Sequence, residues 1–175
     1  MTEARLVEAE GGWLEPEGEG WFVLNARDAR WSSNELGWYC PFEGARRFPE
    51  FGFNLNFLPP GKPMAMYHHE NLQEGFFVLR GEAVLVVEGE EHPLREWDYV
   101  HTPAGVPHVV VGAGGGALVI AVGHRVSGEG ATYPVEPAAA KYGASVDEET
   151  TNAGQEYAKF GPLVDSRYPG GLFGE

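Results

Sequence analysis

Between residues 51 and 122 the chain consists of short runs of strand-forming residues, separated by segments rich in glycine and proline. Runs of this length that follow one another so closely are typical of antiparallel sheets, which close into barrels or stack as sandwiches. The runs are 53–57, 76–79, 83–87, 99–102, 108–111 and 117–122. They predict an all-β fold with no long helix in this part of the chain.

Glycines separate several of the predicted strands. Arg80-Gly81 and Glu88-Gly89-Glu90 are predicted to be hairpin turns, and the glycine-rich segment 112–116 a flexible connection. After Gly123 the strand pattern stops. We predict short helices over 137–142 and 147–159 and a tail over 163–175. The chain thus divides into a loose N-terminal arm (1–20), a barrel (21–125) and a C-terminal extension (126–175) that packs on the barrel or on a partner subunit.

The first of these strands alternates strictly between aromatic or aliphatic residues and asparagines. Successive side chains of a strand point to opposite faces, so Asn54 and Asn56 face one side and Phe53, Leu55 and Phe57 the other. The pattern leaves two interpretations open. The asparagines either offer polar contacts to a ligand inside a barrel or face solvent on an edge strand.

Charge and cysteine content restrict the partners and the compartment. The formal net charge of −14 would repel nucleic acids and anionic membrane surfaces. Cys40 is the only cysteine, so the chain has no internal disulfide, which suits a reducing cytoplasm. The apolar stretch 109–122 is too short and too interrupted by glycine to span a bilayer, and the N-terminus does not read as a signal peptide. We expect a soluble, cytoplasmic protein with neither nucleic acid nor membrane as a partner.

Side chains that can ligate a metal gather in two short stretches. The first reads Tyr67-His68-His69-Glu70 and is followed by Glu74, and the second ends at a histidine, residue 108. In a strand, His68 and Glu70 share one face, and Tyr67 and His69 share the other. A shift of one residue in register exchanges the two faces, so this spacing leaves both pairs open. Imidazole and carboxylate groups together suit a divalent transition metal.

This first stretch resembles the first motif of the cupin superfamily, which reads Gly, five residues, His-x-His, three or four residues, Glu, six residues, Gly. Glu74 and Gly81 have the required six-residue gap. A four-residue gap before Glu74 places the Tyr67/His69 pair at the two histidine positions, and a three-residue gap places the His68/Glu70 pair there. Either alignment lacks one of the two histidines.

The second stretch resembles the second cupin motif, which reads Gly, five residues, Pro-x-Gly-x-x-His, three residues, Asn. Pro103, Gly105 and His108 match it. Trp97 stands in place of the opening glycine and Gly112 in place of the asparagine. The two motifs together cover about 60 residues closely, and as a pair they are specific.

The resemblance implies a double-stranded β-helix, or jelly-roll cupin barrel, with a short C-terminal helical appendage and one divalent metal inside the barrel. The chain is most similar to small cupins that read Tyr-His-x-Glu-x-x-Gln-Glu and then Trp-Asp-aromatic-Val-His, which favours the three-residue gap. The implied metal ligands are His68, Glu70, Glu74 and His108, with His69 in reserve. Such a set suits Zn, Fe, Mn or Ni, and a cation would relieve the repulsion between its carboxylates.

Two further residues are candidates for proton transfer beside the metal. His101 lies on the same face of its strand as Tyr99, and histidine is a common general acid or base. Tyr67 could donate its hydroxyl proton toward a bound ligand. Each has a structural alternative, because His101 could be a hydrogen-bonded structural histidine and Tyr67 a large packing residue.

Cupins include both enzymes and ligand-binding proteins, so the resemblance leaves two classes of function. The first is a metal-dependent enzyme of the dioxygenase, isomerase or lyase type acting on a small organic molecule. The alternative is a non-catalytic module that binds a small molecule or sugar. Cupins commonly pair through their outer strands, which implies a homodimer.

Overall fold

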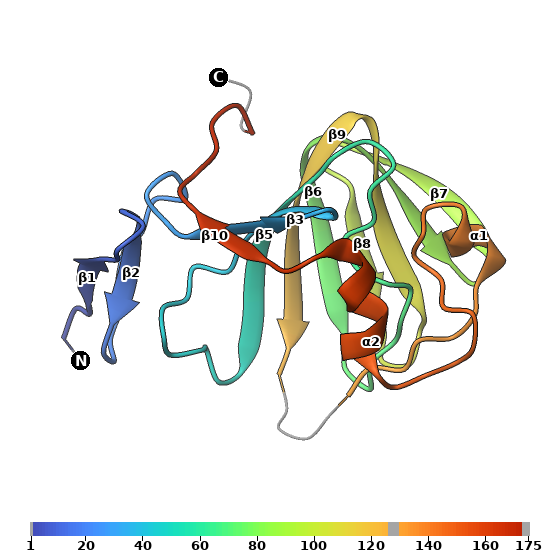
Figure 1. Ribbon diagram of the computed structural model, residues 1–175, viewed down its shortest axis with the longest axis horizontal. Coiled ribbons are helices and arrows are strands. Elements are labelled where there is room, and N and C mark those ends of the chain that lie inside the picture. The colour runs from blue at the N-terminus through green and yellow to red at the C-terminus, as the bar shows by residue number, and fades with distance from the viewer. Residues whose placement is uncertain (1, 126–129, 173–175) are drawn as a thin grey trace.

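The protein folds as an antiparallel jelly-roll barrel with additions at both ends of the chain (Figure 1). The computed structural model describes residues 2–125 and 130–172. Within these residues one sheet has eight strands in the order β10-β3-β4-β5-β9-β6-β7, with β8 paired to β6 beside this path. The barrel strands are β3 (Trp31–Asn34), β4 (Gly37–Cys40), β5 (Phe51–Leu58), β6 (Glu74–Val87), β7 (Glu90–Arg95), β8 (Tyr99–Thr102) and β9 (His108–His124). The predicted all-β jelly roll is confirmed.

β6 and β9 are the two long strands of the barrel, and they pair along most of their length. Each joins two strands that the sequence predicts as separate. The predicted turn at Arg80-Gly81 and the predicted connection over 112–116 are therefore wrong. The chain bends at these glycines but stays within the sheet, and the pairing register shifts next to Gly81.

The bend depends on glycine because the two strands approach closely there. Gly81 has φ of 81° and Gly116 has φ of 100°, values that residues with a Cβ rarely adopt. A Cβ on Gly81 would lie 2.0 Å from the carbonyl oxygen of Gly116. Strand glycines that admit a neighbouring backbone are a common way to turn the corner of a barrel.

Replacing Gly81 with alanine should therefore destabilise the barrel. The positive φ alone costs about 1–3 kcal/mol for a residue with a Cβ, and the contact with Gly116 adds to it. We expect the free energy of unfolding, measured by urea denaturation, to fall by about 2 kcal/mol or more. Gly115→Ala is the matched control, because a Cβ there would have no atom within 4 Å. Equal midpoints for the two variants would contradict this account of the bend.

The hairpin between β6 and β7 is tight, as predicted. Glu88 and Gly89 have φ of 51° and 80°, and Val87 pairs directly with Glu90. Two successive residues with positive φ match the right-handed twist of the flanking strands.

Both ends of the chain contain more strand than the sequence predicts. In the arm expected to be loose, β1 (Arg5–Glu8) and β2 (Leu14–Glu17) form a separate antiparallel hairpin, which lies apart from the barrel in Figure 1. In the predicted tail, β10 (Val164–Ser166) pairs with β3, and the Ser32 hydroxyl donates a hydrogen bond of 2.6 Å to Asp165. The sequence did not predict these strands because their hydrophobic patterns are weak. They form because pairing provides hydrogen-bond partners for the backbone N–H and C=O groups.

The helices of the C-terminal extension are shorter than predicted. α1 (Pro137–Ala140) and α2 (Ala153–Tyr157) fall inside the two predicted segments, and the 3₁₀ turn η1 (Ala158–Phe160) that follows α2 ends one residue beyond the second segment. The Glu136 carboxylate caps α1 by accepting a hydrogen bond from the Ala138 backbone N–H.

Four apolar clusters hold the described parts of the barrel and its additions together, and the smallest contains Met66, Tyr133 and Val146. The largest contains Leu58, Phe76, Val78, Ala83, Leu85, Val100, Val110, Ala117 and Val119. A second joins β6 and β9 to the C-terminal extension and contains Tyr67, Val86, Val109, Val111, Ala139 and Ala144. The third packs the outer strands and contains Ala29, Trp31, Cys40, Leu55 and Leu172.

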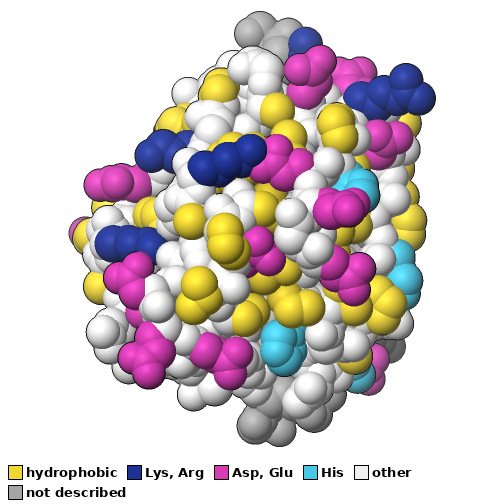
Figure 2. Space-filling model, turned by 90° about the vertical axis from the view of Figure 1, so that its right-hand side faces the viewer, with side chains coloured by type: hydrophobic (Ala, Val, Ile, Leu, Met, Phe, Trp, Pro, Cys, Tyr) yellow, Lys and Arg dark blue, Asp and Glu magenta, His cyan; other side chains and the backbone are white. Residues whose placement is uncertain are grey.

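Acidic side chains are spread over the surface seen in Figure 2, among hydrophobic and uncharged ones. On this face they do not gather into a single patch.

Candidate metal centre

A cavity of about 290 Å³ lies within the barrel, between β5, β6, β9 and the C-terminal extension. All four ligands implied by the motifs border it. Its lining comprises Tyr39, Asn54, Asn56, Met64, Ala65, His68, Glu70, Glu74, Phe76, His108, Val109, Val110, Ala121, Tyr133 and Tyr157.

The alternation of β5 directs its two asparagines into this cavity. Asn54 and Asn56 line the cavity, whereas Leu55 packs in the outer cluster beside Trp31. Oδ1 of Asn54 and Nδ2 of Asn56 are buried and have no hydrogen-bond partner among residues 2–125 and 130–172. Of the two interpretations of this strand, the structure selects the one with polar groups inside the barrel.

Backbone pairing sets which side chains of the first motif face the cavity. The backbones of His68 and His108 exchange two hydrogen bonds of 3.2 and 2.9 Å, and the carbonyl of Glu70 accepts one of 2.7 Å from Gly105. His69 pairs instead with the backbone of Thr132 and does not line the cavity. The structure thus brings the His68/Glu70 pair to the cavity, as the three-residue gap requires.

Both histidines of the centre are held by backbone carbonyls. Nδ1 of His68 lies 2.7 Å from the carbonyl oxygen of Met66, and Nδ1 of His108 lies 2.9 Å from that of Val106. Because a carbonyl only accepts, Nδ1 carries the proton in each contact. In the neutral imidazole Nε2 is then bare, which is the tautomer that ligates a metal through Nε2.

The bare nitrogens lie beside a buried carboxylate. Nε2 of His108 is 3.2 Å from Oε2 of Glu74, and Nε2 of His68 is 4.0 Å from the same oxygen. Within the described parts of the chain, Oε2 of Glu74 and Nε2 of His108 are both buried without a hydrogen-bond partner. Neutral imidazole nitrogens and a carboxylate are all acceptors, so the group needs a proton or a cation among them.

Burial and charge determine the protonation of these groups. Burial lowers the pKa of His68, although the Met66 carbonyl and Glu74 act in the opposite direction, and this favours the neutral ring. Burial by itself would raise the pKa of Glu74, but the neighbouring His108 and His68 bring it below its ordinary value. A neutral His68 and an ionised Glu74 are the forms that bind a cation.

The donors are not yet gathered as closely as a bound ion requires. Among residues 2–125 and 130–172, no group of three or more His, Cys, Asp or Glu side chains is already arranged to hold a metal. The chemistry of the donors and the partnerless buried atoms of Glu74 and His108 nevertheless fit a divalent cation.

The structure does not bring Tyr67 to the cavity. Its side chain is buried in the second apolar cluster, against Val86 and Ala139. Burial, with the negative charges of Glu136 and Glu88, raises the pKa of Tyr67. Tyr67 therefore has the packing role that was its structural alternative. Its position does not support the predicted proton transfer to a ligand.

His101 is also outside the cavity. It is exposed on β8, on the same face as Tyr99, and borders a surface depression with Phe51 and His124. The neighbouring Val100 and Thr102 are the buried residues of that strand. Glu74 and Phe76 line both this depression and the cavity, and a catalytic role for His101 stays a prediction.

Three tyrosines at the cavity were missed by the sequence reasoning. Tyr133 stacks on His68 at 5.6 Å between ring centroids, and the Tyr157 hydroxyl accepts a hydrogen bond of 3.1 Å from the backbone N–H of Met66. Tyr39 lines the cavity from β4. The available signal was the position of Tyr133 and Tyr157 in a segment otherwise poor in large apolar residues.

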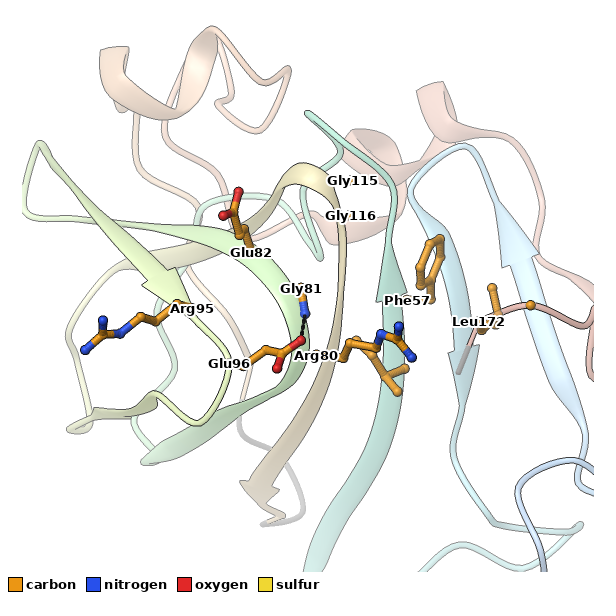
Figure 3. Close-up of a pocket in the computed structure, with 11 residues that line it drawn as sticks. Phe57, Arg80, Gly81, Glu82, Arg95, Glu96, Gly115, Gly116 and Leu172 are labelled. Carbon is orange, nitrogen blue, oxygen red and sulfur yellow. Dashed lines mark hydrogen bonds between the residues drawn. The ribbon is translucent and has the colours of Figure 1, made fainter. Parts of the chain in front are cut away.

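A larger depression of about 700 Å³ lies at the bend of β6 and is lined by other residues. Figure 3 shows that the Arg80 and Arg95 side chains there point in different directions, and that Glu96 accepts a hydrogen bond from the backbone of Gly81. Its charged groups do not converge, so it is not a comparable site.

The Cupin domain family model matches residues 55–135, which include the four candidate ligands. A sugar phosphate isomerase of the cupin superfamily from Silicibacter pomeroyi is 24% identical, with 83% of this chain and 80% of that protein covered and a TM-score of 0.51. The polyketide cyclase RemF from Streptomyces resistomycificus is 15% identical, with 60% and 80% covered and a TM-score of 0.52. At these identities the likeness concerns the fold alone.

A protein provisionally described as a sugar phosphate isomerase from Acidithiobacillus ferrooxidans is 22% identical, with a TM-score of 0.47. The alignment covers 55% of this chain and 64% of that protein, slightly less than two thirds of its length. No curated protein matches the chain. No helix in the described parts of the chain is long and apolar enough to cross a membrane. The family model thus identifies residues 55–135 as a cupin domain, and both motifs of this domain lie around one cavity.

Proposed function

We propose that this protein is a metal-dependent enzyme acting on a small organic molecule, with one divalent metal held by His68, Glu70, Glu74 and His108. One observation carries the proposal. Two imidazole nitrogens and a carboxylate oxygen, all acceptors, lie together in a buried cavity, and the oxygen and one nitrogen have no hydrogen-bond partner. A single cation would satisfy all three.

The ligand set is richer in oxygen than a site with three histidines and suits Zn, Fe(II), Mn or Ni. When bound, such a metal acts as a Lewis acid on an oxygen-bearing substrate. The present separations mean that the donors would have to draw together on binding.

The remaining residues of the cavity would orient the ligands and the substrate. The carbonyls of Met66 and Val106 hold the imidazoles in the ligating tautomer. The apolar side chains that line the cavity, Phe76, Val109, Val110 and Ala121, restrict the access of water. The amides of Asn54 and Asn56 offer the substrate one acceptor and one donor.

Metal loading tests the proposal. We expect one Zn²⁺, Fe²⁺, Mn²⁺ or Ni²⁺ per chain by elemental analysis after loading and dialysis. At a free metal concentration of 100 times the Kd, binding adds about 2.7 kcal/mol of stability. For a chain of this size that raises the melting temperature by about 5–10 °C, and a chelator should reverse the shift. A chain that takes up none of these metals under any loading condition would contradict the proposal.

Turnover distinguishes the enzyme from the alternative of a binding module. A compound that stabilises the metal-loaded protein in a thermal-shift screen should be converted on incubation. Recovery of that compound unchanged would favour the binding module. The homodimer and the cytoplasmic location stay predictions from the sequence.

A further inference from the structure

A second, mostly apolar cavity adjoins the candidate metal centre. It has a volume of about 240 Å³, and we call it the apolar annex. Four residues line both cavities: Tyr39, Asn56, Met64 and Tyr157. The remaining lining of the annex is Asn34, Leu36, Gly37, Trp38, Phe57, Leu58 and Leu163.

The shared wall has a polar group on a mostly apolar surface. Asn56 is only 7% exposed, and its Nδ2 has no hydrogen-bond partner. A buried donor without a partner is costly, so a ligand oxygen placed at this wall would gain a hydrogen bond that the free protein lacks. Beyond it, Leu36, Trp38 and Leu163 line the annex from the β3–β4 hairpin and the C-terminal extension.

We infer that the ligand of this protein is amphipathic, with an oxygen-bearing head in the candidate metal centre and a short apolar tail of a few carbons in the apolar annex. Nδ2 of Asn56 donates a hydrogen bond to an oxygen of the head where the two cavities meet. The assignment of the head rests on the proposed function. The assignment of the tail rests on the shared wall and on the apolar lining.

The C-terminal extension takes part in this selection. Tyr157 forms part of the shared wall, and its hydroxyl is tied to the backbone of Met66, so the position of its ring is fixed. Leu163 borders the annex from the same extension. A ligand that fills both cavities therefore contacts the barrel and the extension together.

A homologous series of alkyl hydroxamates tests the inference, because each member has the same metal-binding head. The dissociation constants of acetohydroxamate and butanohydroxamate would be measured by NMR titration of the full chain, with zinc and without it. Burial of a methylene is worth about fourfold in affinity. We expect butanohydroxamate, with two more methylenes, to bind about 15-fold more tightly in both forms.

Leu163→Asp places a charge at the apolar annex, and we expect it to reduce this ratio to less than about fivefold. Val164→Asp is the matched control, since Leu163 is 59% exposed and Val164 60% exposed, but only Leu163 lines the annex. The control should keep the 15-fold ratio. Leu36→Gln, on another wall of the annex, should lower the ratio as Leu163→Asp does.

The outcomes separate the two assignments. A ratio near one in the unmodified protein, no binding of butanohydroxamate in either form, or equal ratios for Leu163→Asp and Val164→Asp would overturn the tail assignment. Failure of zinc to tighten acetohydroxamate binding would count against the proposed metal centre. In that case the ratio of the two hydroxamate dissociation constants in the metal-free protein still tests the tail assignment.

Discussion

Replacing His108 with alanine is expected to abolish stoichiometric binding of a divalent metal. Its Nε2 lies 3.2 Å from Oε2 of Glu74 and has no hydrogen-bond partner among the described residues. Loss of an outer partner of a metal ligand already costs about 10- to 100-fold in affinity, so loss of the ligand itself should cost more. Zinc titration calorimetry and elemental analysis after dialysis would measure the effect.

The variant should keep its fold, because His108 pairs with His68 through backbone atoms that alanine retains. Near-UV circular dichroism of the metal-free protein checks this. His92→Ala is the matched control, since His92 is an exposed histidine on β7 away from the cavity. If His108→Ala keeps one zinc per chain at the affinity of the control, the metal is bound elsewhere.

The second large effect is expected from Glu70, and it tests the alignment of the first motif. Glu70→Gln keeps the size of the side chain but removes the negative charge that attracts a cation. We expect zinc affinity to fall about 10- to 100-fold or more. His69→Gln should stay within about threefold of the unmodified protein, because His69 does not line the cavity. Parallel titrations of the two variants give the comparison.

The reverse result would show that the four-residue gap is the functional one. His69 pairs with Thr132 in the present structure, so a metal on His69 would require this bridge to rearrange. Loss of metal from His69→Gln together with full occupancy in Glu70→Gln is therefore the result that contradicts the ligand set.

The sequence was most informative where the structure depends on local geometry. The spacing of Glu74 and Gly81 and the second motif ending at His108 carried the resemblance to cupins, which implied that the ligating residues come together, and these residues border one cavity. Strand alternation also predicted which residues share a face, as for Asn54 and Asn56. Such patterns work because the side-chain direction repeats every two residues whatever the rest of the fold does.

The same local patterns failed where one signal is compatible with two structures. Glycine permits both a reversal of the chain and a bend within a strand, so Gly81 and Gly116 could not show which occurs. The long-range pairing of β6 with β9 decided for the bend. Neither His101 nor Tyr67 lines the cavity, because His101 borders a neighbouring depression that shares Glu74 with it and Tyr67 packs in the second apolar cluster, so their catalytic roles stay predictions.

By itself the sequence predicted the class of fold from its pattern of short strands, and its resemblance to the two cupin motifs implied the four candidate ligands. Only the tertiary structure decided that the asparagines of β5 point inward and that Tyr133 and Tyr157 complete the cavity. These facts depend on how the sheet closes and on where the C-terminal extension packs. No short pattern encodes such contacts, since they join segments up to about 100 residues apart.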